Sequence, residues 1–102
     1  MNADERRWDA VFEAEDSVVV RGRYFIIVGD VIEGRLNVGD QILATDPETI
    51  LPGRIILAVE TGSRVKGGRS VGLCIAKDTD PDINQLQSIQ IEGVKIMVAD
   101  QG

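Results

Sequence analysis

The side chains of this sequence that are most able to do chemistry are the clustered oxygens of the segment DTDPDIN. They belong, at alternate positions, to Asp78, Asp80, Asp82 and Asn84. Hard cations prefer such oxygen clusters, and the spacing resembles the start of a calcium-binding loop. That loop also needs a glycine and a bidentate glutamate, where this chain has Ile83 and Ile89. We therefore expect a solvated acidic turn and no metal site.

Nucleophilic and acid–base chemistry has no better basis in the sequence. Cys74 is the one cysteine and the chain contains no histidine, so the usual base for a thiol nucleophile is missing. Glu15 and Asp16 are adjacent, and neighbours on a strand face opposite ways, which makes them a poor acid–base pair. The phosphate-binding pattern GxxxxGK[ST] does not occur. We predict no catalytic residue, no cofactor and no enzymatic activity.

Positive charge is concentrated in one short stretch. Arg64, Lys66 and Arg69 precede a predicted strand, where they are either solvated loop charges or contacts to phosphate or an acidic partner. Together with Arg21 and Arg23 they are the candidate contacts to RNA or another anion. The formal net charge of −6 disfavours a nucleic-acid partner, because the averaged field repels phosphate.

Chain length and composition limit the architecture. A chain of 102 residues suits a single domain, which we place at 11–102 after an N-terminal extension at 1–10. One cysteine cannot form an internal disulfide, and the N-terminus has no apolar segment of signal-peptide type, so a cytoplasmic location is expected. No apolar run approaches the roughly 20 residues that span a bilayer, so we expect no membrane contact.

The elements that must position these residues are short strands. Runs of β-branched residues alternate with glycine, aspartate and proline, which is typical of an all-β domain with closely spaced turns. Strands are predicted near 12–20, 24–32, 41–44, 53–60, 70–76 and 94–99. The helical signal is confined to DPDINQLQ, at 80–87, where Asp80 could cap a first turn opened by Pro81. Six strands suit a small barrel.

Three segments carry a resemblance to a known family. FEAEDSVVVRGRYFIIVGDVIEGRLNVGDQI, at 12–42, resembles the opening of the second domain of elongation factor Tu and related translational GTPases. VKGGRSVGLCIA, at 65–76, and DINQLQSIQIEGVKIMVAD are similar to later parts of that domain. The positions that match the family's spacing in the first segment are Glu15, Asp16, Gly22, Arg23, Gly29, Gly34, Val38, Gly39 and Asp40. The resemblance implies a six-stranded closed antiparallel β-barrel, here free-standing and without the GTPase domain.

The resemblance also implies where the family's function is altered. In elongation factor Tu the Glu–Asp pair, a nearby aromatic residue and a threonine help to hold the aminoacyl end of tRNA. Here the aromatic position is Val18 and the threonine position is Val28, so stacking and hydroxyl contacts are lost. Tyr24 stands where the second glycine of the family's GRG would be. Aminoacyl-tRNA binding is therefore not expected.

The segment RYFIIVGDVIEG is apolar on both faces of its predicted strand. Alternation points Phe25, Ile27, Gly29 and Val31 into the core. The outward side chains form a candidate interface, which comprises Tyr24, Ile26, Val28 and Ile32, and Ile56 of the next-but-one predicted strand by the same parity. Each aliphatic side chain forgoes on the order of 1.5–3 kcal/mol if it stays in water.

This face has three candidate occupants. They are the N-terminal segment around Trp8, folded over the face, a second copy of the chain in a homo-oligomer, and a different protein. The preferred hypothesis is a non-catalytic binding module that uses the face for self-association or a protein partner, with Ile26→Asp expected to abolish association and preserve the fold. The alternative is a translation-related accessory domain that binds RNA or the ribosome through the arginines and lysine named above.

Overall fold

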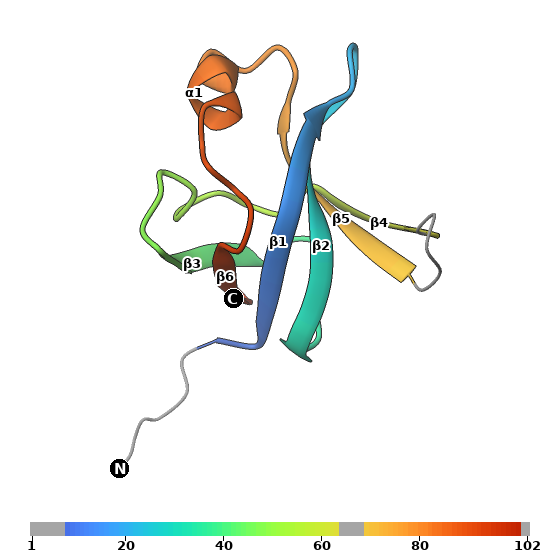
Figure 1. Ribbon diagram of the computed structural model, residues 1–102, viewed down its shortest axis with the longest axis vertical. Coiled ribbons are helices and arrows are strands. Elements are labelled where there is room, and N and C mark those ends of the chain that lie inside the picture. Colours follow the sequence, from blue (N-terminus) through green and yellow to red (C-terminus); the bar gives the residue numbers. More distant parts are fainter. Residues whose placement is uncertain (1–7, 64–68, 101–102) are drawn as a thin grey trace.

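The computed structural model describes residues 8–63 and 69–100 of the chain (Figure 1). Strands account for most of them, and one short helix, α1 (Ile83–Gln87), lies between the last two strands. The strands are β1 (Ala10–Val19), β2 (Tyr24–Gly34), β3 (Gln41–Asp46), β4 (Ala58–Ser63), β5 (Arg69–Lys77) and β6 (Lys95–Ala99). The predicted all-β class is confirmed, and β1 begins at Ala10.

The six strands form one antiparallel sheet in the order β3-β6-β1-β2-β5-β4. Figure 1 shows β1 and β2 side by side in the middle, with β3 and β6 on one side and β5 and β4 on the other. The prediction of a closed barrel is wrong, because β3 and β4 are the two edges and do not pair along their lengths. Within the described residues, an isolated bridge between Gln41 and Ile55 connects β3 to the segment that precedes β4.

The sheet stays open because of the segment between β3 and β4. A strand was predicted over 53–60, but strand structure begins only at Ala58. The preceding residues run along β3, where the N–H of Ile42 donates to the carbonyl of Arg54 at 2.8 Å and the N–H of Ile56 donates to that of Asp40 at 2.9 Å. The chain therefore leaves β3 before β4 starts, so the two edge strands share no ladder.

The core lies on the inner face of the sheet, as strand alternation predicted. Phe25 and Ile27 of β2 are buried there, and Val31 packs against the same cluster. Phe12 of β1 joins them, and Leu86 of α1 is fully buried in the same core. The inner face is thus filled by the chain's own side chains.

The helix is shorter than its predicted span and begins later. Asp82 occupies the N-cap position and makes no side-chain capping bond, so the prediction of Asp80 as the cap is wrong. The Asp80 carboxylate instead accepts a hydrogen bond from the N–H of Lys77 at 3.1 Å. In the described part of the chain, no helix is long and apolar enough to cross a membrane.

Candidate protein-docking face

The outer face of the sheet is built from two rows of side chains that cross β1, β2, β5 and β4. Strand pairing sets the rows, because residues directly opposite one another on neighbouring strands share a face. The first row contains Asp16, Val28, Gly72 and Glu60. The second contains Val18, Ile26, Cys74 and Ala58.

The predicted interface residues are not equally accessible on this face. Ile32 is 49% exposed, and Tyr24 and Val28 are half-buried. Ile26 is only 9% exposed, although it points outward as predicted. Ile56 is fully buried in the core, and its assignment to the interface is wrong. The parity prediction failed there because Ile56 precedes β4, and its backbone is hydrogen-bonded to the residues just before β3.

Ile26 is buried because its neighbours in the sheet close around it. Val18 of β1 and Cys74 of β5 lie opposite Ile26 on its two sides. A side chain at Gly72 would bring its Cβ to 3.0 Å from the Ile26 Cγ2 atom, so Ile26 extends into the space that this glycine leaves. Ile26 thus forms the apolar floor of this part of the outer face. Val18, which is 48% exposed, is the accessible apolar side chain beside it.

A shallow depression of about 200 Å³ lies over this floor, and we call it the outer hollow. Two glycines, Gly62 of β4 and Gly72 of β5, create it, because they place no side chain above the neighbouring strands. Its lining is completed by Val18, Ile26, Val28, Glu60, Thr61 and Ser70. An apolar floor beside an edge strand is a surface that can receive a side chain from a partner.

The charges beside the outer hollow are mainly carboxylates. Asp16 lies at the β1 end of the first row, and its Oδ1 atom accepts a hydrogen bond from the N–H of Ser17 at 2.8 Å. Glu60 lies at the β4 end and pairs with Arg23 at 3.5 Å. Both partners of that pair are well exposed, so the pair is screened by solvent and contributes little to stability. The face therefore presents a carboxylate at each end of the row, with the Arg23 guanidinium beside the one at the β4 end.

Cys74 lies in this face but not at its surface. Burial raises the pKa of the Cys74 thiol, the nearby Glu60 carboxylate raises it further, and Arg23 partly opposes the shift. The thiol is therefore neutral at physiological pH, and it is fully shielded from solvent. A neutral, enclosed thiol is a poor nucleophile. The contribution of Cys74 to this face is therefore its packing between the strands.

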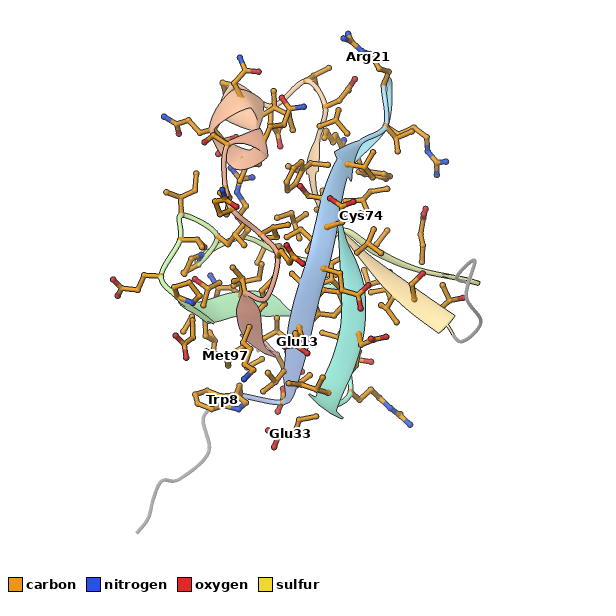
Figure 2. All side chains as sticks on the ribbon, viewed as in Figure 1. Trp8, Glu13, Arg21, Glu33, Cys74 and Met97 are labelled. Carbon is orange, nitrogen blue, oxygen red and sulfur yellow. The ribbon has the colours of Figure 1, made fainter. Side chains whose placement is uncertain are left out.

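Of the predicted anion contacts, the structure describes the side chains of Arg21 and Arg23. Arg21 is exposed at the tip of the turn between β1 and β2, at the far end of the molecule from Glu33 (Figure 2). Arg23 lies nearby, whereas Arg64 and Lys66 fall outside the described residues. Arg69 begins β5, and its side chain also lies outside the described part.

The structure adds one cation that the sequence did not indicate. Lys77 pairs with Tyr24 across β5 and β2, and both line a depression of about 380 Å³ together with Gly22 and Arg23. This pairing joins residues that are far apart in the chain, so no local pattern could reveal it. A carboxylate lies close by, since Asp78 accepts a hydrogen bond from the N–H of Gly22 at 2.6 Å.

The acidic turn distributes its carboxylates among different partners. Asp78 bonds to the turn between β1 and β2, Asp80 bonds to the backbone of Lys77, and Asp82 forms an ion pair with Arg54. Within residues 8–63 and 69–100, no group of three or more acidic or cysteine side chains is placed to hold a metal ion.

Trp8 does not cover the outer hollow. It lies two residues before β1, next to Asp9, whose N–H donates to the carbonyl of Val98 in β6 at 2.7 Å. Val18 lies at the opposite end of β1, about 30 Å away at the rise of an extended strand. Figure 2 accordingly shows Trp8 at one end of the molecule and Arg21 at the other. The rest of the predicted N-terminal extension, at 1–7, lies outside the described residues.

Sequence reasoning missed the residues that shape the outer hollow, namely Gly62, Gly72 and Thr61. The glycine pair is visible in the sequence, but only the β4–β5 pairing shows that both glycines lie on the outer face. Comparison of the chain with protein-family models, with curated proteins and with solved structures found no match.

Proposed function

We propose that this chain is a non-catalytic binding module that docks another protein on the outer face of its sheet. The observation that carries the proposal is the outer hollow with Val18 at its rim, because the inner face is already filled by the core. A large apolar side chain that stays half exposed beside an apolar floor loses water contact only when a partner covers it.

A different protein is favoured over a second copy of the chain by charge. A face-to-face pair of identical surfaces would bring the carboxylates of Asp16 and Glu60 into one interface with the same carboxylates of the second copy. The molecule as a whole also carries a net charge of −6, which opposes self-association. A partner with positive charge around an apolar group meets both features of the face.

A photo-crosslinking amino acid at Val18 tests the proposal in cells that produce the protein. We expect one defined protein to crosslink at this position, and the purified partner to bind the unmodified chain. The matched control is the same amino acid at Ile50, which is similarly exposed but lies in the loop between β3 and β4. Identical products at both positions, or products that contain only the chain itself, would contradict the proposal.

The exposure of each side chain decides which substitution can disrupt partner binding without unfolding the protein. Ile26→Asp would place a carboxylate in a nearly buried position and destabilise the fold. Val18→Asp changes an exposed side chain on the same face, so we expect it to weaken partner binding with little loss of stability. Binding of the purified partner to this variant with unchanged affinity would count against the outer face.

The second candidate is the RNA- or ribosome-binding role, which one observation favours. Arg23, Tyr24 and Lys77 surround the same depression, so two cations and an aromatic ring meet there. Phosphate contacts make binding steeply dependent on salt. A titration of the chain with single-stranded RNA at low and at moderate salt tests this role, and a flat response at low salt would exclude it.

A further inference from the structure

The edge strand β4 lies directly beside the outer hollow and has one sheet neighbour. Along its length β4 pairs with β5, from Ala58 opposite Cys74 onward, without a register shift. The other edge of the sheet is different, because residues 54–56 cover part of β3 with backbone hydrogen bonds. Within the described residues, no strand pairs with the outward edge of β4. Alternate residues of an edge strand direct their N–H and C=O groups away from its single neighbour.

The sequence of β4 lacks most of the features that keep edge strands from pairing. Proteins usually protect such edges with proline, lysine, a bulge or a covering loop. β4 reads AVETGS, without proline or lysine, and its pairing with β5 is regular. One charged residue, Glu60, remains, and it repels only partners of its own sign. β4 is therefore able to accept a further strand of suitable charge.

The outer hollow supplies a site for one side chain of that strand. A strand added to β4 would lie one sheet spacing beyond Gly62, about 4.8 Å away, and would project alternate side chains over the outer face. Side chains diagonally across neighbouring strands are within contact distance. Gly62 leaves this path open, since a Cβ atom there would meet only the Ser70 hydroxyl oxygen, at 3.8 Å. An apolar side chain opposite Gly62 can thus lie over the β4 end of the outer hollow.

The charge of the added strand follows from Glu60. A carboxylate on an outward-facing edge position is stabilised by a cation directly opposite and destabilised by another carboxylate. A second copy of this chain would bring its own Glu60 to the shared edge, whereas a segment with lysine or arginine would pair with it. The Arg23 side chain is a weak competitor, because it meets Glu60 at 3.5 Å with both groups well exposed.

We infer that β4 receives an extended segment of the partner protein as an added strand, and that this segment carries a basic residue opposite Glu60 and, two positions away on the same face, an apolar residue opposite Gly62. The inference rests on the proposed function and specifies its partner. Main-chain hydrogen bonds along β4 would supply affinity, while the outer hollow and Glu60 would select the side chains.

The probe is a peptide with blocked termini in which lysine and valine take turns at every second position, with threonine between them, so that both face the same side of the strand. Titrated into isotope-labelled protein and followed by NMR, it is expected to shift the backbone amides of β4 and slow their hydrogen exchange. The amides of Ser70 and Gly72 on β5, which line the same hollow, should shift with them. The matched probe, in which glutamate replaces lysine, should bind at least several-fold more weakly, because it meets Glu60 with like charge.

Two variants and a control define the site. Glu60→Lys should weaken binding of the valine–lysine peptide about threefold to tenfold, through loss of attraction and gain of repulsion. Gly62→Val should also weaken it by filling the outer hollow. Glu92→Lys makes the same charge change in the exposed turn before β6 and should leave binding unchanged. Circular dichroism confirms that each variant is folded.

The outcomes separate the inference from the proposed function. Peptide shifts that leave the β4 amides unaffected, or equal binding of both peptides, would overturn the added strand. If the crosslinked partner still protects Val18 and Val28 in that case, the outer face keeps its docking role and only the mode of binding is wrong. Absence of both peptide binding and a crosslinked partner would overturn the two proposals together.

Discussion

At the scale of single residues, Gly29 shows how closely two backbones of this sheet approach. It lies on β2 opposite Ala14, beside an irregularity in the register with β1. A Cβ atom at Gly29 would lie 2.0 Å from the carbonyl oxygen of Glu13. Neither backbone can yield without breaking the ladder between β1 and β2, so no larger residue fits.

Gly29→Ala should therefore lower the free energy of unfolding by about 3 kcal/mol or more, at or above the upper end of overpacking costs. Gly62→Ala is the matched control in the same sheet, where the new Cβ makes only an ordinary contact. We expect it to change stability by less than about 1 kcal/mol. Urea unfolding of both variants gives the comparison, and similar losses would show that space at Gly29 is not the constraint.

Cys74 links burial to the pH dependence of stability. Burial raises the pKa of its thiol in the folded state, so the unfolded chain loses this proton first as the pH rises. The free energy of unfolding should then fall as the pH rises above about 8.5, the ordinary thiol value. Unfolding curves at neutral and alkaline pH should show an added decline in the wild type that Cys74→Ala lacks. An identical decline in both proteins would contradict this role.

At the scale of elements, α1 depends on tertiary contacts more than on its own sequence. It has five residues, and its N-cap makes no side-chain hydrogen bond, so local helical stability is small. Leu86 is fully buried in the core, and Asp82 at the cap pairs with Arg54. The buried leucine, rather than the ion pair, holds the helix on the sheet.

Leu86→Ala should accordingly destabilise the protein by about 2–4 kcal/mol through lost burial and the cavity left behind. Asp82→Asn removes only a partly exposed ion pair, and we expect a loss of about 1 kcal/mol or less. Thermal unfolding of the two variants measures both effects. A larger loss for Asp82→Asn would show that the ion pair positions the helix.

At the scale of the whole molecule, the two edges of the sheet differ in how far other backbone segments cover them. Residues 54–56 follow part of β3, whereas β4 extends beyond them. Exposed edges promote association between copies of a protein. Here the negative charge beside β4 opposes association with a second copy, while it leaves the edge accessible to a basic partner.

The isolated chain should therefore be monomeric at about 0.1 M salt, where charge repulsion still acts over about 10 Å. Light scattering across a concentration series measures the solution mass. A stable dimer under these conditions would contradict the charge argument and identify a second copy as the occupant of the outer face. Val18→Asp, compared with the wild type, would then show whether that dimer uses this face.

Local patterns in the sequence determined the strand content and the inner face. Runs of β-branched residues located most of the strands, and two-residue alternation correctly buried Phe25 and Ile27, because both properties depend only on neighbouring positions. The strand predicted at 53–60 was the exception, since the observed strand begins at Ala58.

The remaining features depended on which strands pair and in what register, which only the tertiary structure decided. Pairing along β3 buried Ile56 and left the sheet open, in place of the predicted barrel. The rows across β1, β2 and β5 enclosed Ile26 and brought Lys77 to Tyr24. Those contacts join residues far apart in the chain, and a shift of one residue exchanges the faces of a strand. A single sequence does not encode such pairings in any local pattern.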